Sequence, residues 1–140
     1  MIPLLVTFIP MLTDTGGNAG SQSSTMIIRG MAVGEIEAGD ILRVLWKELR
    51  VGVIVGVLLG LVNYIQLVIR FPGQEMLCLT VVLSLLATVM LAKTIGCVLP
   101  IAAQVLHLDP AIMAAPLITT IVDAVSLIIY FQLACSLLKI

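Results

Sequence analysis

The sequence predicts an all-α membrane protein with about four transmembrane helices in each chain. Its mean hydropathy is +1.23, and only 11% of its 140 residues are charged. A soluble domain of this composition would expose far more apolar surface than a monomer can bury. Three long apolar runs, at residues 51–69, 76–106 and 111–138, can each cross about 30 Å of hydrocarbon as a helix. Helices are expected because an open sheet would leave backbone groups unpaired in lipid.

The first span is less regular than these three. Residues 2–12 and 26–33 are apolar, but each run is too short to cross the membrane alone. Joined through the polar stretch TDTGGNAGSQSST at residues 13–25, they make one span with a glycine-rich middle. The expected spans are therefore about 2–33, 44–69, 76–106 and 110–138. The other arrangement is three spans and a re-entrant element.

The connection at residues 34–50 is a long charged segment, and together with Arg29 it holds four of the seven basic residues. Because Lys and Arg gather on the cytoplasmic side of membrane proteins, we expect this connection in the cytoplasm and the chain in the cell membrane. Asp40 can cap an amphipathic helix at about residues 40–50 that lies at the interface and leads into the second span. Asp109 and Pro110 are typical of a helix N-cap and the first helical position.

A glycine repeat marks the second span. Gly52, Gly56 and Gly60 recur at four-residue spacing. Small residues at this spacing let helices pack closely in a membrane. The pattern fits packing between two chains and packing within one chain equally well.

Two of the expected spans carry polar residues along one face of the helix. In the first span, positions i, i+4, i+7, i+8, i+11 and i+15 are Asp14, Asn18, Ser21, Gln22, Thr25 and Arg29. Glycines beside this face let backbone groups approach closely, and they are Gly16, Gly17 and Gly20. In the last span, positions i, i+4, i+7 and i+11 are Thr119, Asp123, Ser126 and Tyr130. The two stripes are candidates for the wall of a polar path through the bilayer.

The charged residues within the spans each have more than one interpretation. Asp123 lies near the middle of the last span, where an acid is costly and usually faces water, a partner or an ion. It is either an ion site or an acid paired inside the bundle with Lys93 or Arg29. Asp14 is either a second acid of the path or a solvated acid near the outer interface. Lys93 can snorkel to the interface, pair with an acid, or repel cations as part of a gate.

The inventory of reactive side chains argues against an enzyme. The single histidine, His107, provides no Ser/His/Asp set, and TGGNAG matches no dinucleotide or phosphate loop. Cys78, Cys97 and Cys135 lie in apolar runs without metal-ligand spacing. The net charge of −1 argues against a nucleic-acid partner. The remaining carboxylate, amide, hydroxyl and carbonyl oxygens suit hard cations such as magnesium, calcium or manganese.

Two sequence blocks, in order along the chain, carry a family resemblance. The first is PLLVTFIPMLTDTGGNAGSQSSTMIIRGMAVGEI, followed by LRVLWKELRVGVIVGVLLG, and the second is GCVLPIAAQVLHLDPAIMAAPLITTIVDAVSLIIYF. Over essentially the whole chain, they resemble the transmembrane domain of the MgtE family of magnesium channels. The resemblance implies a homodimer with one pore on the two-fold axis, lined by the second and fifth spans of a five-span domain. This chain would run from the second to the fifth span, without the family's first span or its cytosolic helical and CBS domains.

The resemblance also implies which residues meet the ion. The family's central acid matches Asp123 and its pore asparagine matches Asn18, and the ion is held largely hydrated near that acid. The chain departs from the family pattern at Asp14, which replaces a glycine whose carbonyl faces the pore. It departs again at Ala115, which replaces an asparagine, and at Lys93, which replaces a polar neutral residue. The residues expected to meet the ion are Asp14, Gly17, Asn18, Gln22, Ala115, Thr119 and Asp123.

The resulting hypothesis is a passive channel that conducts magnesium, with manganese or calcium as the other candidate ions. A membrane potential of about 100 mV would favour inward movement of a divalent ion by about 4.6 kcal/mol, so that entry needs no ATP site. The expected partners are the lipid bilayer, a second copy of the chain and the divalent cation. A sodium- or proton-coupled magnesium exchanger would use the same Asp123. A structural membrane module, with its acids paired to Lys93 and Arg29, is the third interpretation.

Overall fold

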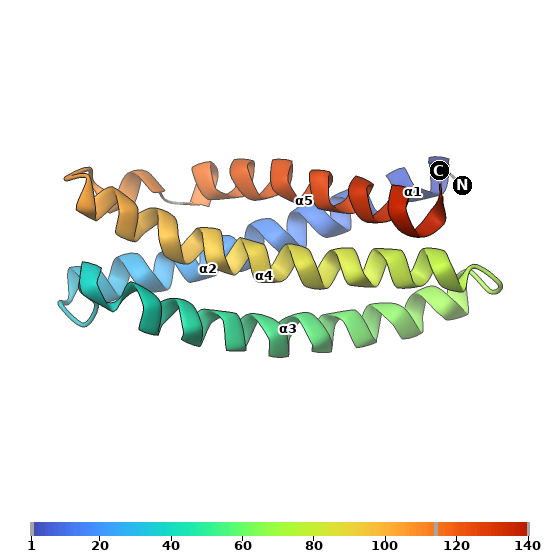
Figure 1. Cartoon of the computed structure of the whole chain (residues 1–140), viewed down its shortest axis with the longest axis horizontal. Coiled ribbons are helices and arrows are strands. Elements are labelled where there is room, and N and C mark those ends of the chain that lie inside the picture. Colours follow the sequence, from blue (N-terminus) through green and yellow to red (C-terminus); the bar gives the residue numbers. More distant parts are fainter. Residues whose placement is uncertain (1, 114, 140) are drawn as a thin grey trace.

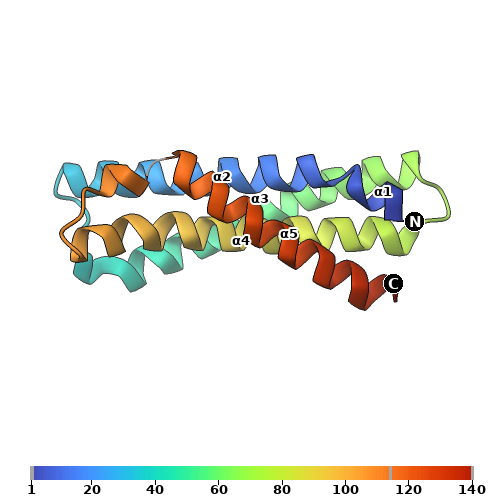
Figure 2. The same cartoon turned by 90° about the horizontal axis from the view of Figure 1, so that it is seen from above.

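The computed structural model describes residues 2–113 and 115–139, which form helices joined by short turns (Figure 1). In chain order the helices are α1 (Ile2–Val6), α2 (Ile9–Ala32), η1 (Ala38–Asp40), α3 (Ile41–Arg70), α4 (Glu75–Val105), η2 (Pro110–Met113) and α5 (Ala115–Leu138). No strand occurs among the described residues, which confirms the all-α prediction. The four long helices run along the length of the molecule, and α5 crosses the others at an angle (Figure 2).

The central helix of the bundle is α4, which contacts α2, α3 and α5. Half of its most apolar stretch is buried, compared with 22% in the stretches that include α3 and α5. Its buried apolar side chains run from Leu77 through Leu85 to Ile101 and take part in all three apolar clusters of the bundle. The other three long helices therefore pack around α4.

Three helical segments within the described residues are long and apolar enough to cross a membrane. They are Ala38–Arg70, Glu75–Val105 and Pro116–Leu138, close to three of the four expected spans. With its 24 residues, α2 would extend about 36 Å at 1.5 Å per residue. Its polar middle keeps its hydropathy below that of the other three helices. That α2 also crosses the membrane stays a prediction.

The first expected span, residues 2–33, is divided into α1 and α2 by a break just before Pro10. Proline has no N–H to donate, and its ring clashes with the carbonyl four residues earlier, here that of Val6. The chain adjusts by a tighter turn, in which the Phe8 N–H donates to the Leu5 carbonyl at 3.2 Å. The buried Tyr130 hydroxyl donates to the same Leu5 carbonyl at 2.9 Å. A residue of α5 thus supports the break in the first span.

Residues 41–50 are the first turns of α3, continuous with the span, and do not form a separate interfacial helix. Asp40 occupies the N-cap position of α3, as expected, but its carboxylate does not cap that helix. It accepts a hydrogen bond from the Glu37 backbone N–H at 3.1 Å, because η1 precedes α3 directly. The expected cap at Asp109 is present, since its carboxylate accepts a hydrogen bond from the Ala111 N–H at 2.9 Å, although the helix it caps is the short η2.

The glycine repeat of α3 packs against α4 within the same chain. A Cβ atom on Gly56 would lie 3.5 Å from Leu86 of α4, and one on Gly60 would lie 3.2 Å from Val82. The absence of side chains at these positions therefore sets the spacing of the α3–α4 pair. The repeat is explained by packing inside one chain.

The closest approach in the bundle joins α2 to α4. A Cβ atom on Gly96 would overlap the carbonyl oxygen of Gly20 and lie 3.1 Å from the Cβ of Ser23. One on Gly20 would lie 3.2 Å from the carbonyl oxygen of Ala92. The two backbones therefore meet without an intervening side chain, and neither can retreat without opening the core around Ala19 and Val89.

We predict that Gly96→Ala destabilises the bundle by about 1–3 kcal/mol, because the added methyl group must push α2 away from α4. The measurement is the apparent melting temperature of the purified protein in detergent. Gly39→Ala is the control, because a Cβ atom there meets nothing within 4 Å. Equal melting temperatures for the two variants would show that the close approach is not required.

Candidate functional site

A polar cavity of about 380 Å³ lies between α2 and α5. Its lining residues are Pro10, Thr13, Asp14, Gly17, Asn18, Thr119 and Asp123. Five of the seven residues that the sequence assigned to the ion therefore meet in one place. Asp14 and Asn18 are exposed at the mouth of the cavity, and Thr119 and Asp123 are half-buried.

Gly17 allows α5 to approach α2 at this cavity. A Cβ atom on Gly17 would lie 3.1 Å from Cγ2 of Thr119 and 3.7 Å from Oδ1 of Asp123. The carboxylate of Asp123 consequently lies against the backbone of α2 at Gly17, the residue before Asn18. The structure thus gives Gly17 a spacing role in bringing the two polar stripes together.

The two acids of the cavity have no cationic partner among the described residues. Neither Asp14 nor Asp123 forms an ion pair or a side-chain hydrogen bond in the part of the chain that the structure describes. Arg29, one of the partners considered for them, instead lines a different cavity. Two like charges that share one cavity repel each other, and a cation between them would relieve this repulsion.

The two remaining candidate residues do not line the cavity. Gln22 lies on the exposed face of α2, one turn beyond Asn18. Ala115 is the first residue of α5, and its side chain lies outside the described parts of the structure. Thr119 donates its hydroxyl to the Pro116 carbonyl at 3.0 Å, so its oxygen lone pairs stay available to a ligand.

The second polar stripe divides into two parts with different surroundings. Thr119 and Asp123 face the cavity, whereas Ser126 and Tyr130 are buried within the bundle. The Ser126 hydroxyl donates to the Val122 carbonyl at 2.6 Å, one turn back in the same helix. Because α5 crosses α2 at an angle (Figure 2), a stripe that begins at the cavity turns into the core further along. These two residues therefore do not extend the path that the stripe suggested.

Lys93 pairs with an acid, which was one of the three interpretations of this residue, but the acid is Glu48. The Lys93 Nζ and a Glu48 carboxylate oxygen are 3.2 Å apart, and both side chains are more than 90% buried. Sequence reasoning placed Glu48 in a solvated cytoplasmic connection and missed this pair. The available signal was spacing, because Glu48 precedes Gly52 by four residues and so shares the face of α3 that packs on α4.

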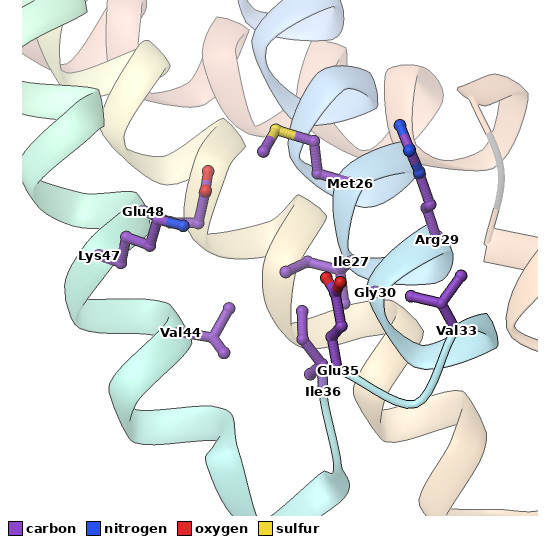
Figure 3. A pocket seen from close by; sticks show the side chains of 10 residues that line it. All are labelled: Met26, Ile27, Arg29, Gly30, Val33, Glu35, Ile36, Val44, Lys47 and Glu48. Carbon is purple, nitrogen blue, oxygen red and sulfur yellow. The ribbon is translucent and has the colours of Figure 1, made fainter.

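A second cavity, of about 350 Å³, lies between α2 and α3. Figure 3 shows Met26, Ile27 and Arg29 on the α2 wall and Val44, Lys47 and Glu48 on the α3 wall. The sequence did not predict this cavity, because its walls come from helices that meet only in the folded chain.

Among the described residues, no three His, Cys, Asp or Glu side chains are grouped so that they could hold a metal ion. The α2–α5 cavity offers two carboxylates, one amide and two hydroxyls. Such an oxygen set suits a hard cation that keeps part of its water shell.

Comparisons with known proteins agree on one family. A family model described as MgtE, divalent cation transporter, matches residues 9–133. A magnesium transporter MgtE from Thermus thermophilus is 35% identical over 138 residues, which cover 99% of this chain and 30% of the relative. A protein of the same name from Bacillus subtilis is 35% identical over 130 residues, covering 93% of this chain and 29% of the relative. A third protein of this name, from Enterococcus faecalis, is 29% identical over 137 residues, which cover 97% of this chain and 30% of the relative.

The chain spans about three-tenths of the length of the curated relatives it matches. The family model begins at the first residue of α2 and ends within α5. The α2–α5 cavity therefore lies within the matched region.

We predict that Asp14→Asn raises stability in the presence of a chelator by about 1 kcal/mol, because it removes repulsion between two carboxylates in one cavity. Divalent cations should reduce the stability difference between Asp14→Asn and the wild type, since they screen the same repulsion in the wild type. The measurement is the apparent melting temperature with chelator and with each cation. Asp109→Asn, at the residue before η2, is the control. Its melting temperature should equal that of the wild type both with chelator and with each cation. Equal shifts of the melting temperature in the two variants would contradict the prediction.

Proposed function

The chain belongs to the MgtE family of divalent cation transporters, and from this premise we propose that it forms the pore of a passive magnesium channel. The observation that carries the proposal is the cavity between α2 and α5, in which Asp14 and Asp123 have no cationic partner among residues 2–113 and 115–139. An unpaired acid in a membrane-spanning helix is costly unless water or an ion occupies its surroundings. Asp123 is the central ion site of the proposed pore.

The chemistry of the cavity supports a hydrated magnesium ion as its occupant. Magnesium prefers oxygen ligands and dehydrates reluctantly, so proteins often hold it by one or two carboxylates through its own water molecules. A cavity of about 380 Å³ has room for an ion together with such waters. The oxygens of the Gly17 carbonyl, the Asn18 amide and the Thr119 hydroxyl are acceptors for hydrogen bonds donated by that water shell.

The proposed pore lies between two copies of the chain. Asp14, Asn18 and Gln22 form an exposed face of α2, and lipid is a poor environment for such a face. A second copy related by a two-fold axis would enclose it and would double the carboxylates around the path from two to four. In this arrangement α2 and α5 of both copies line the pore, and α3 lies on the lipid side.

The proposed direction of transport is inward and requires no energy source. At an inside-negative potential of about 100 mV, a divalent cation gains about 4.6 kcal/mol on entry, twice the figure for one charge.

We also propose that the chain is a multi-pass protein of the cell membrane with residues 34–50 in the cytoplasm. The exposed Arg43, Lys47 and Arg50 of this connection support that orientation.

We predict that Asp123→Asn lowers magnesium flux by at least about tenfold, because the central charge of the pore contributes at least ~1.4 kcal/mol to holding the ion. The measurement is magnesium uptake by liposomes that contain the purified chain, under an inside-negative potential. Asp109→Asn is the matched control, since asparagine also serves as an N-cap and the residue lies outside the cavity.

Three results of this experiment would count against parts of the proposal. Equal flux through Asp123→Asn and wild type would place the ion path elsewhere. Flux that requires a sodium or proton gradient would indicate a coupled exchanger using the same acid. Equal uptake of magnesium, calcium and manganese would show that the cavity does not select magnesium.

A further inference from the structure

Three buried polar side chains from three different helices meet in one cluster. The Ser23 hydroxyl of α2 donates a hydrogen bond to a Glu48 carboxylate oxygen of α3 at 2.6 Å. The Lys93 ammonium of α4 donates to the same carboxylate oxygen and to the Ser23 oxygen, each at 3.2 Å. We name these residues the Ser23–Glu48–Lys93 cluster.

The cluster is enclosed by the protein and carries no net charge. Ser23, Glu48 and Lys93 are 0%, 4% and 5% exposed. The Lys93 stem passes over Gly52 of α3, where a Cβ atom would lie 3.2 Å from the Lys93 Cδ. Because Glu48 neutralises Lys93, the lysine does not present a free positive charge to a cation path.

A buried ion pair is weak evidence for added stability. The cost of removing both charges from water often equals what their attraction returns, and apolar replacements are frequently tolerated. The hydrogen bonds of this cluster have a definite geometry, because one Glu48 carboxylate oxygen on α3 accepts from both Ser23 of α2 and Lys93 of α4. The role to test is therefore that the cluster positions α2.

The surroundings of the cluster show why α2 would need such a restraint. Glu48 lies on the wall of the cavity between α2 and α3 (Figure 3). That cavity leaves space beside α2, so packing alone does not hold the helix against α3 at this level. The hydrogen bond from Ser23, one turn before Ile27 of the cavity wall, supplies a directional contact between α2 and α3.

Ser23 lies on the opposite side of α2 from the cavity with the two acids. It is five residues after Asn18, which places it about 140° around the helix and about 7.5 Å along it. Asn18 and Gln22 are exposed, whereas Ser23 is buried. A contact that fixes the rotation of α2 at Ser23 therefore also fixes the direction in which Asn18 and Gln22 point.

We propose that the Ser23–Glu48–Lys93 cluster is a positioning device that holds α2 in the rotation and depth at which Asn18 and Gln22 face the ion path. The proposal rests on the proposed function, because the ion path is the pore of the proposed channel. It assigns Ser23, Glu48 and Lys93 as positioning residues that act through α2 and do not touch the ion.

The first test is Ser23→Ala, which removes the link to α2 and leaves the Glu48–Lys93 pair in place. The readout is the rate at which a charged, water-soluble thiol reagent modifies Asn18→Cys or the buried Ala19→Cys, each in a Cys135→Ala background in liposomes. We expect Ser23→Ala to change the ratio of the two rates by about tenfold, a coupling of the size found between contacting residues. Ser84→Ala is the matched control, because that buried hydroxyl donates at 2.7 Å to Thr80 of its own helix.

The second test is the double variant Glu48→Leu with Lys93→Met, which removes both charges together with the oxygen that accepts the Ser23 hydrogen bond. We expect it to melt close to the wild type, because no unpaired charge remains buried. We also expect its half-saturating magnesium concentration to rise by about tenfold, because α2 is released, a change of the size seen when contacting residues are uncoupled. If the pair served stability alone, the double variant would instead have both the melting temperature and the magnesium dependence of the wild type.

The proposal is overturned if Ser23→Ala and the double variant both keep the wild-type ratio of thiol rates and the wild-type magnesium dependence. The thiol rates require no transport, so they test the cluster even if Asp123→Asn conducts like the wild type. Conversely, unchanged thiol rates together with loss of flux in Asp123→Asn would remove the positioning role and leave the proposed channel intact.

Discussion

The backbone of α2 lies directly against α4 and α5, and the rest of the bundle depends on this contact. In lipid, helices gain little by hiding apolar surface from one another, so close packing and hydrogen bonds must hold them together. Glycine supplies the closeness: Gly20 meets Gly96 of α4, and Gly17 leaves room for Thr119 of α5. Because α2 is held this closely, Asp123 reaches the cavity and Ser23 reaches Glu48.

Many polar side chains of the bundle find hydrogen-bond partners in one of three ways, and the two acids of the candidate site use none of them. Some hydroxyls donate to a carbonyl one turn back in their own helix, as Ser84 and Ser126 do. The Tyr130 hydroxyl donates to a carbonyl at the break between α1 and α2. The Ser23–Glu48–Lys93 cluster pairs its opposite charges. Asp14 and Asp123 have none of these partners within the described residues, and this contrast is why we assign the ion to them.

Local patterns in the sequence were enough to predict much of this arrangement. Three expected spans, at residues 44–69, 76–106 and 110–138, match α3, α4 and α5 to within five residues. The four-residue spacing of polar positions selected most of the cavity lining. The same reasoning was wrong for Ser126 and Tyr130, because a straight helical stripe takes no account of the angle at which α5 crosses the bundle. It also missed Glu48, since a charged residue near other charges is ordinarily solvated. Neither outcome depends on the local sequence alone.

By itself, the sequence determined that the chain lies in a lipid bilayer, that it is all-α, and which residue types could bind a cation. These follow from composition and from the 3.6-residue period of the helix, which are properties of each segment taken alone. Only the tertiary structure decided that Lys93 pairs with Glu48, so that Asp123 has no cationic partner in the part of the chain that the structure describes. The reason is that partners 45 residues apart are chosen by how the helices cross and by where glycines let a side chain pass.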